Sequence, residues 1–354
     1  MRVSRRYAAA VTRGPTSSDV ALAPALPYPD GWFAIAFSDE VGPGEVVTRP
    51  LMGEDVVLYR IREGAVRAVR PYCPHLGAHL GLGRVEGDEL VCRFHGFAFD
   101  RHGTCVRTGY GSEPPKAPVA QHHVREVNGA VFVWRHHDDR APDWEIPTWH
   151  VLGRLPARHA VWEMAGHAQD LLENSVDFGH FSALHGWDSV EVIDPVVYEG
   201  TRFRARLRMR DRFPLIGTQE VELDGEAYGL GCIHADVRAP RVGIETCVTA
   251  MATMIAPGRF QFRQTSRLEV AAPTGLPPAL GRLIGRGLAR VLDVPMFRWG
   301  CAVTAQDFPI WEHKCHVSPP RLAHGDGPIG SFRQWTRQFY PPIAHPEDGP
   351  LPRS

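Results

Sequence analysis

The first third of the chain carries short runs of β-branched and aromatic residues between turn-forming residues, a pattern typical of antiparallel strands. Glu63 and Gly64 separate the first two runs, and Asn128-Gly129, a strong signal for a two-residue hairpin turn, separates the last two. The runs occupy residues 56–62, 65–69, 90–93, 97–100, 122–127 and 130–135. We therefore expect a small antiparallel β domain at the start of the chain.

Beyond this domain the pattern changes. Residues 136–147 are polar and contain proline, which is typical of a linker. Apolar residues at helical spacing follow at 168–184, and residues 192–270 hold several strand-like stretches, which we expect to form one curved antiparallel sheet. Two further helices, the first basic and amphipathic and the second mostly apolar, are expected at 276–292 and 295–314.

These elements divide the chain into three parts and predict an α+β fold class. A flexible lead-in is expected at residues 1–30, a first domain at 31–147 and a second domain at 148–354, with a Pro- and Gly-rich surface tail at its end. The lead-in has a basic start, but its apolar run ends at Val11, short of the roughly 7 to 15 apolar residues of an export signal. No stretch approaches the ~18 apolar residues of a spanning helix. We therefore expect no export signal and no membrane span.

Composition narrows the possible partners and the compartment. The 354 residues are 44% hydrophobic and 22% charged with a formal net charge of -1, which is typical of a soluble globular protein. Without a net positive field, the chain is not expected to bind nucleic acid or a membrane surface. Seven scattered cysteines, an odd number, argue against a disulfide framework and favour a reducing compartment, so we expect a cytoplasmic protein.

Two short motifs combine cysteine with histidine. PYCPHLG contains Cys73 and His75, and VCRFHG contains Cys92 and His95, with 16 residues between His75 and Cys92. A mononuclear zinc site usually takes two cysteines from one motif and two histidines from the other, whereas mixed motifs suit a cluster with cysteines on one iron and histidines on the other. The pattern favours a two-iron cluster, and the alternative is a zinc site or a coincidental set of hairpin residues.

A second polar group lies in the first helix expected for the second domain. Asn174, Asp177 and His180 follow at three-residue steps and are expected to share a helix face. His185 lies five residues after His180, about 140° away on a regular helix. Both imidazoles can then reach one metal only through a wider π-type turn or a helix break near Gly186. Polar residues on a solvated helix face are the alternative.

These motifs resemble those of a known family. The CxH and CxxH motifs resemble the signature of Rieske 2Fe-2S domains, and NSVDFGHFSALH resembles the mononuclear iron motif of the Rieske non-heme iron oxygenases. The resemblance extends from about Trp32 to Tyr340, and CPHLGAHLGLG, IWEHK and DGPIGSFRQWTRQFY look most like the branch of 3-ketosteroid 9α-hydroxylases and sterol C7-desaturases. It implies a Rieske domain followed by a helix-grip (START-like) catalytic domain.

The resemblance also implies metal ligands. The residues that match the ligands of the 2Fe-2S cluster are Cys73, His75, Cys92 and His95. His180 and His185 match two ligands of a mononuclear Fe(II), and Asp307 matches the carboxylate that completes a facial triad. Glu312 is the fallback, but a carboxylate amid Ala, Val and Phe needs a cation to remain ionised, which favours Asp307.

The resemblance also suggests roles for two residues that are not metal ligands. Asp177 resembles the aspartate that links the cluster of one subunit to the iron of its neighbour, and its carboxylate is expected to hydrogen-bond the imidazole of His180. Asn174 is either a residue near the iron or a helix-face amide bound to water.

The implied function is that of a terminal oxygenase component, which uses O2 to hydroxylate or desaturate a hydrophobic polycyclic, steroid-like small molecule. Electrons from NAD(P)H must come through a separate reductase or ferredoxin, because the GxGxxG at residues 325–330 is followed by too few residues for a βαβ unit. Electron transfer between subunits implies a homotrimer. The alternatives are a Rieske demethylase, aromatic hydroxylase or oxidative cyclase of a biosynthetic pathway, and an electron carrier or lipid-binding protein that has lost the mononuclear iron.

Overall fold

The computed structural model describes residues 25–150, 153, 155–213, 217–272, 275 and 277–342. Most of the expected lead-in and the end of the expected tail lie outside the described residues. In the part of the chain that is described, no helix is both long and apolar enough to cross a membrane.

The N-terminal domain consists of three small antiparallel sheets with the orders β1-β10-β9, β2-β3-β4 and β5-β6-β7-β8. The expected turn between the last two strands is present, because Asn128 and Gly129 both have positive φ, 56° and 80°. The strands are β1 (Gly31–Phe37), β2 (Val46–Leu51), β3 (Glu54–Arg60), β4 (Val66–Val69), β5 (Arg84–Glu86), β6 (Glu89–Val91), β7 (Ala98–Phe99), β8 (Cys105–Arg107), β9 (Val124–Val127) and β10 (Ala130–Arg135).

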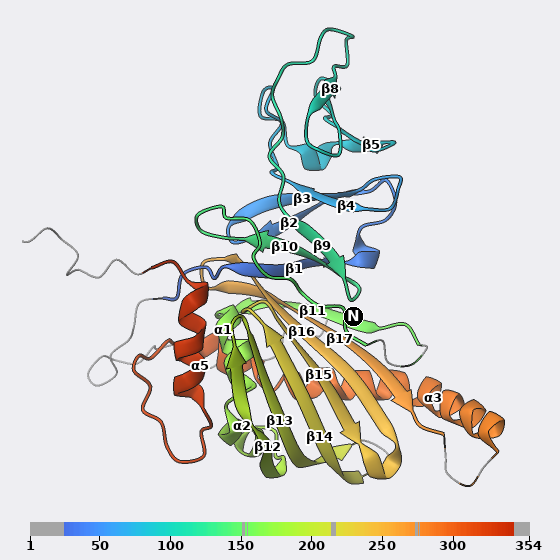
Figure 1. Cartoon of the computed structure of the whole chain (residues 1–354), viewed down its shortest axis with the longest axis vertical. Coiled ribbons are helices and arrows are strands. Elements are labelled where there is room, and N and C mark those ends of the chain that lie inside the picture. The colour runs from blue at the N-terminus through green and yellow to red at the C-terminus, as the bar shows by residue number, and fades with distance from the viewer. Residues whose placement is uncertain are drawn as a thin grey trace, which may run out of the picture.

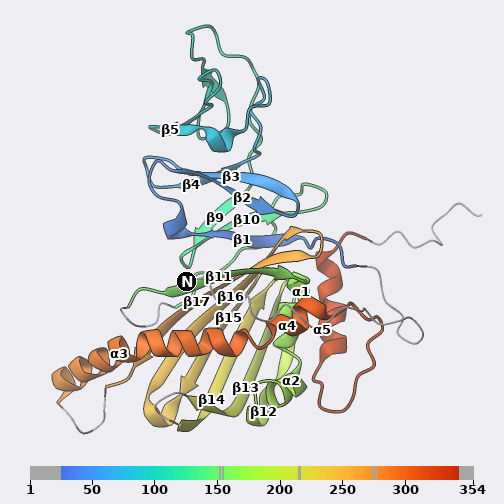
Figure 2. The ribbon, with the colours of Figure 1, turned by 180° about the vertical axis from the view of Figure 1, so that it is seen from behind.

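The C-terminal domain is built on one seven-stranded antiparallel sheet with the order β11-β17-β16-β15-β14-β13-β12, which confirms the expected large sheet. Its strands are β11 (Arg158–Ala165), β12 (Asp188–Glu199), β13 (Arg202–Phe213), β14 (Gly217–Tyr228), β15 (Cys232–Ala239), β16 (Ile244–Ala256) and β17 (Arg259–Val270). The helices are α1 (Ala168–Asn174), α2 (Phe178–Ala183), α3 (Pro278–Thr304), α4 (Phe308–His313) and α5 (Ile329–Thr336). The long helix α3 crosses one face of the sheet, and α1 and α2 lie at one end of it (Figures 1 and 2).

Strand β13 shows why the sheet has one covered and one open face. Its buried residues alternate with arginines, as the two-residue period of a strand requires. Leu207 and Met209 pack with Phe181 of α2 and Met296 of α3. The arginines on the other face form ion pairs with neighbouring strands, namely Arg204 with Asp224, Arg206 with Asp194 and Arg208 with Glu222.

The helix expected at 168–184 is two helices, so that prediction was wrong. Helix α1 ends at Asn174, and α2 begins at Phe178. The cause is local, because Asp177 is the N-cap of α2 and its carboxylate accepts a hydrogen bond from the backbone N–H of His180 at 3.3 Å. An N-cap residue has non-helical dihedral angles, so the helix cannot pass through it.

The prediction of two separate helices at 276–292 and 295–314 was also wrong, because the single helix α3 continues through Pro295 to Thr304. A proline inside a helix costs roughly 3 kcal/mol. Packing on both sides offsets this cost: Met296 is buried against the sheet, and the buried Asp293 forms an ion pair with Arg158 of β11 at 2.6 Å. The chain then turns, and α4 follows as a separate short helix.

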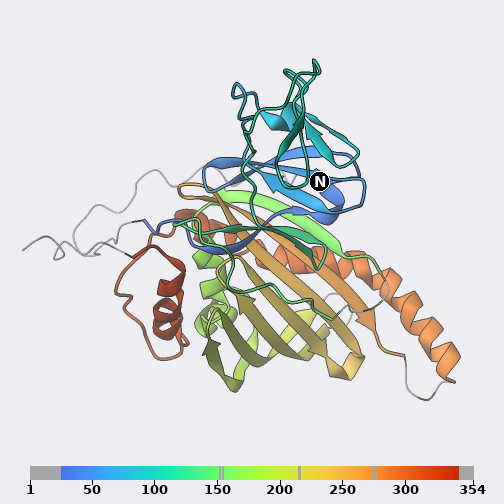
Figure 3. The same cartoon turned by 45° about the horizontal axis from the view of Figure 1, so that its top comes forward.

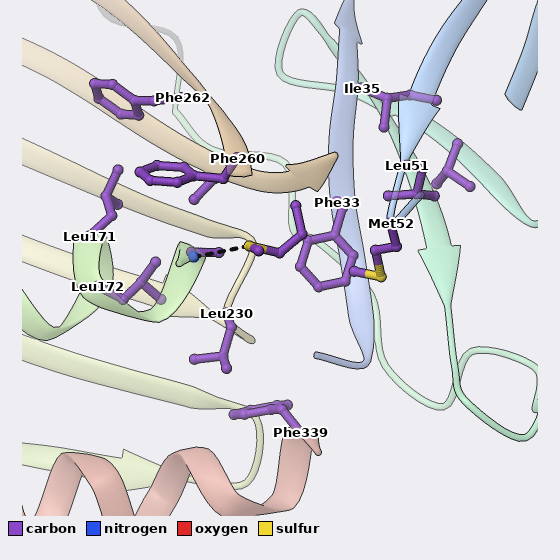
Figure 4. Close-up of a cluster of buried hydrophobic side chains, with 14 of the residues drawn as sticks. Phe33, Ile35, Leu51, Met52, Leu171, Leu172, Leu230, Phe260, Phe262 and Phe339 are labelled. Atoms are coloured by element: carbon purple, nitrogen blue, oxygen red, sulfur yellow. Dashed lines mark hydrogen bonds between the residues drawn. The ribbon is translucent and has the colours of Figure 1, made fainter. Parts of the chain in front are cut away.

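The two domains share one continuous core. Arg263 of β17 is buried and donates hydrogen bonds to the carbonyl oxygens of Ala34 and Ile35 in β1, at 3.2 and 2.7 Å. Thr253 of β16 donates to the same Ala34 oxygen at 2.7 Å. Figure 4 shows the apolar side chains that meet at this boundary, among them Phe33, Ile35, Leu51 and Met52 from the first domain and Leu171, Leu172, Leu230 and Phe260 from the second. The second domain is therefore packed firmly against β1 (Figure 3).

We expect Gly231→Ala to destabilise this boundary. A Cβ at Gly231 would lie 2.1 Å from the carbonyl oxygen of Trp32 in β1, so the backbones would have to separate. Overpacking of this kind costs about 1–3 kcal/mol, which a lower midpoint of thermal unfolding would show. Gly287→Ala in α3 is the matched control, because its Cβ meets nothing within 4 Å and alanine favours a helix. Equal midpoints for the two variants would show that the close approach at Gly231 is not restrictive.

Candidate functional site

Two loops of closely similar backbone geometry lie in the N-terminal domain, one between β4 and β5 and one between β6 and β7. They contain Cys73, His75, Cys92 and His95. In each loop the cysteine carbonyl oxygen accepts a hydrogen bond from the glycine four residues on, Gly77 at 2.9 Å and Gly96 at 3.1 Å. Both glycines have positive φ, 74° and 66°, and a Cβ at Gly96 would lie 2.8 Å from Gly109 Cα. The two loops thus share one backbone arrangement and bring their cysteines and histidines together.

Sulfur and imidazole occupy different depths in these loops. Cys73 and Cys92 are 3% and 2% exposed, whereas His75 and His95 are half-buried, with ring centroids 4.8 Å apart. Burial raises the pKa of the Cys73 thiol to about 11, so a bound metal has to displace its proton. Two inner sulfurs and two outer imidazoles fit a cluster with one iron on each ligand pair.

The second group of candidate ligands comes from two separate parts of the C-terminal domain. His180 lies in α2, which ends at Ala183, so His185 lies beyond the helix and is followed by Gly186 with φ of 68°. The helix break is therefore the arrangement that brings both imidazoles together, with ring centroids 5.1 Å apart. Asp307 lies at the N-terminus of α4, in the turn after α3.

The ligand atoms of His180, His185 and Asp307 all lie within 4.8 Å of one another. The distance from His185 Nε2 to Asp307 Oδ2 is 3.4 Å, and Asp307 is 5% exposed. Glu312, the fallback carboxylate, is exposed and does not belong to this group. Two imidazoles and one carboxylate at this spacing can bind one metal ion and leave other positions open.

Hydrogen bonds fix the orientation of both imidazoles. The Nδ1–H of His180 donates to the main-chain carbonyl oxygen of Asp177 at 2.5 Å, which leaves Nε2 for a metal. The Nδ1 of His185 lies 3.0 Å from Oε1 of Gln306, which likewise leaves Nε2. Sequence reasoning missed Gln306, although its place directly before Asp307 was a usable signal.

The positions of Asp177 and Asn174 differ from the expectation that they share a helix face with His180. Asn174 is the last residue of α1, and Asp177 caps α2. The carboxylate of Asp177 accepts from the backbone of His180 instead of from its imidazole, because the main-chain carbonyl already takes that position. Asn174 Nδ2 donates to Asp307 Oδ1 at 2.8 Å, so this amide orients the candidate carboxylate ligand.

The surroundings shift the pKa values of the two histidines in opposite directions. Burial lowers the pKa of His180, which favours the neutral imidazole that binds metals. Burial also acts to lower the pKa of His185, but hydrogen bonds with Asp307 and Gln306 outweigh it, and the pKa is raised. Nearby, burial raises the pKa of Asp211 to about 6, a residue that sequence reasoning also missed.

The candidate ligands lie in the wall of a cavity of about 210 Å³ between the sheet and the helices. Its polar lining, apart from the three ligands, consists of Asn174, Ser175, Gln264 and Thr304. The rest is apolar: Leu171, Phe181, Trp187, Leu223, Ile233, Ala235, Val248, Ala250, Phe262, Val303 and Trp311. The cavity can therefore hold an apolar molecule directly beside the three ligands.

Comparison with known proteins agrees with this geometry. Residues 31–138 match the Rieske [2Fe-2S] domain, and residues 133–340 match the 3-ketosteroid 9α-hydroxylase C-terminal domain. The chain belongs to the Rieske oxygenases of the 3-ketosteroid 9α-hydroxylase family. The branch expected from the sequence is thereby confirmed.

Relatives of this Rieske oxygenase span nearly the whole chain. A cholesterol 7-desaturase of Bombyx mori is 30% identical over 327 residues, which cover 89% of this chain and 70% of that protein. A probable 3-ketosteroid-9-alpha-monooxygenase oxygenase component of Rhodococcus rhodochrous is 24% identical, covering 88% of this chain and 80% of that protein. Dicamba monooxygenase bound to dicamba shares the fold, with a TM-score of 0.60, 18% identity, and coverage of 88% of this chain and 97% of that chain. The oxygenase is therefore an O2-dependent oxidoreductase.

Proposed function

We propose that the chain is the terminal oxygenase component of a multicomponent system and that it hydroxylates or desaturates a hydrophobic polycyclic, steroid-like substrate. The main observation that supports this proposal is that His180, His185 and Asp307 lie close together in the wall of a mostly apolar cavity. We assign these three residues as ligands of Fe(II). The ligands assigned to the 2Fe-2S cluster are Cys73, His75, Cys92 and His95.

When bound, the cluster and the mononuclear iron would supply electron transfer and O2 activation, and the residues of the chain would bind and orient the substrate. Asn174 holds one oxygen of Asp307, and Gln306 and the Asp177 carbonyl hold the two imidazoles. The apolar lining excludes bulk water and positions a substrate carbon beside the ligands.

We also propose that the chain is divided into a first domain at residues 31–147 and a second domain at residues 148–354.

Two observations support a steroid-like substrate. The cavity lining is mostly apolar, and the relatives are named for action on cholesterol or on 3-ketosteroids. The cavity volume of about 210 Å³ is below the roughly 300–1,000 Å³ of pockets that hold drug-sized ligands. A four-ring substrate therefore requires the cavity to widen, whereas a one-ring aromatic compound requires less change. This keeps the aromatic hydroxylase, the demethylase and the oxidative cyclase as competing functions.

We also propose a homotrimer that takes electrons from NAD(P)H through a separate reductase or ferredoxin in the cytoplasm. The sheet β5-β6-β7-β8, which the candidate cluster loops adjoin, lies at the end of the molecule farthest from the catalytic sheet (Figures 1 and 2). Large apolar side chains are exposed on and beside these loops, namely Tyr72, Leu76, Leu82, Phe94 and Tyr110. Such a patch is typical of a surface that another protein covers, and a neighbouring subunit or a reductase fits this role.

The test is substrate-dependent oxygen uptake by the iron-loaded protein with a suitable reductase. We expect 3-ketosteroids or sterols to stimulate uptake, coupled to product, at least about tenfold more than aromatic or heterocyclic compounds, a difference of ~1.4 kcal/mol in the barrier. Faster coupled turnover of a one-ring aromatic acid would contradict the steroid assignment. Absence of uptake with every compound, despite a reducible cluster, would favour the electron carrier.

A further inference from the structure

A second group of metal-binding side chains lies on the opposite face of the catalytic sheet from the cavity. His234 and Asp236 are two residues apart in β15, and Cys247 pairs with Asp236 across the ladder to β16. Because side chains alternate along a strand, these three share one face, while Ile233, Ala235 and Val248 face the cavity. The group is therefore separate from the candidate iron site.

The three ligand atoms are spaced as a tetrahedral zinc ion requires. The Sγ of Cys247 lies 3.4 Å from His234 Nε2 and 3.4 Å from Asp236 Oδ1, and these last two atoms are 3.6 Å apart. Tetrahedral angles with usual zinc bond lengths give separations of about 3.6 Å for S to N, about 3.5 Å for S to O and about 3.3 Å for N to O. Each observed distance agrees to within ~0.3 Å.

Neighbouring groups hold each ligand in a binding orientation. Thr249, opposite His234 in the ladder, has its Oγ1 3.0 Å from His234 Nδ1, which leaves Nε2 for the metal. Arg238 donates to Asp236 Oδ2 at 3.0 Å, which leaves Oδ1 for the metal. Arg238 is itself held by Glu245 at 2.7 Å. This second layer of hydrogen bonds is what a preformed metal site requires.

The group lies beside the segment that connects the two domains. Cys247 is 8% exposed and does not belong to the lining of the cavity at the candidate iron site. The ring of His234 stacks on Trp149 at 4.5 Å, and the backbone N–H of Trp149 donates to Asn128 in the β9–β10 turn of the first domain. An ion bound here would join two strands of the catalytic sheet next to the segment that connects the two domains.

We propose that His234, Asp236 and Cys247 bind a structural zinc ion, with water as the fourth ligand. Sulfur and imidazole ligands in tetrahedral spacing favour zinc over the hard cations. Asp236 is partly exposed, so solvent reaches the open position. The ion stabilises the junction of β15, β16 and the Trp149 segment, independently of the reaction at the candidate iron site.

The test is zinc analysis and zinc K-edge X-ray absorption on the iron-loaded full chain after dialysis against micromolar zinc. We expect about one zinc per chain, with one sulfur neighbour at ~2.3 Å and the other neighbours nitrogen or oxygen. Cys247→Ser should remove the sulfur neighbour and weaken binding at least about 100-fold. Cys315→Ser, at an exposed cysteine outside the group, is the control and should keep both.

A second variant keeps the proposal testable if Cys247→Ser does not fold. Asp236→Asn keeps the size of a partly exposed side chain, so it should fold normally. It should nevertheless lose the rise in unfolding midpoint that zinc gives the unmodified protein. Failure to bind zinc would show that the thiol only hydrogen-bonds its neighbours. Bound zinc without a sulfur neighbour would place the ion elsewhere, for example at the candidate iron site, and would overturn the proposal.

Discussion

Asp307→Ala is expected to abolish substrate-dependent oxygen uptake, by more than about 100-fold, while the visible spectrum of the 2Fe-2S cluster stays unchanged. Asp307 supplies the only carboxylate among the three candidate iron ligands, and its other oxygen binds Asn174 at 2.8 Å. Removal leaves two imidazoles, too few to hold Fe(II) in a facial triad. The candidate cluster loops lie in the other domain, so their spectrum should not respond.

Glu312→Ala provides the matched control for this prediction. Glu312 is a second carboxylate five residues along the same segment, but its side chain is exposed. We expect this variant to retain its iron and most of its oxygen uptake, measured under the same conditions. If Glu312→Ala lost activity and Asp307→Ala kept it, the carboxylate ligand would be wrongly assigned. Loss of the cluster spectrum in Asp307→Ala would instead show that the two metal sites are not independent.

Asp177→Asn is expected to keep the fold and both metals yet lose at least about 90% of turnover, the size of effect seen when a residue that orients metal ligands is changed. An asparagine oxygen can still accept from the His180 backbone N–H, and the main-chain carbonyl that holds the imidazole is unaffected. What the change removes is the negative charge and the second acceptor oxygen. We propose that, in a trimer, this oxygen would accept a hydrogen bond from a cluster-ligating histidine of the neighbouring subunit.

The decisive measurement compares the rate at which the cluster is reduced with the rate at which it is reoxidised. Reduction of the cluster by the reductase should be as fast in Asp177→Asn as in the unmodified protein, whereas reoxidation of the reduced cluster by O2 and substrate should be slow. Asp188→Asn, at an exposed aspartate at the start of β12, should behave normally in both steps. Normal reoxidation in Asp177→Asn would show that the residue acts only as the cap of α2.

The sequence predicted the elements that depend on local patterns. The hairpin at Asn128-Gly129 was predicted because turn chemistry acts over a few residues. Residues 192–270 were recognised as strand-like because they lack helical spacing. Where tertiary packing decides, the predictions were wrong. Pro295 stays inside α3 because Asp293 and Met296 pack on either side of it, which no local rule indicates. Helix α5 was missed because its Phe332 and Trp335 face Phe203, far away in the sequence.

The candidate site shows the same division. The two Cys-His motifs and the pair His180 and His185 could be read from spacing and from the resemblance to a family. The role of Asp307 could be predicted only from that resemblance. Asp307 lies 122 residues after His185 in the sequence, and the two residues come together only in the folded protein. The contact of Asn174 could not be predicted, since it depends on how α1 and the α3–α4 turn come together. Gln306 was missed although it directly precedes Asp307, and its contact with His185 depends on how the segment after α2 meets the same turn.

Metal analysis with spectroscopy of the purified protein tests the central claim most directly. If the chain holds a 2Fe-2S cluster and a separate Fe(II), it should be brown, contain about three irons per chain, and show when reduced the paramagnetic signal of a cluster with two histidine ligands. His180→Ala should reduce the count to about two irons and leave that signal unchanged. A colourless protein that contains zinc alone, or two irons with and without His180, would contradict the account.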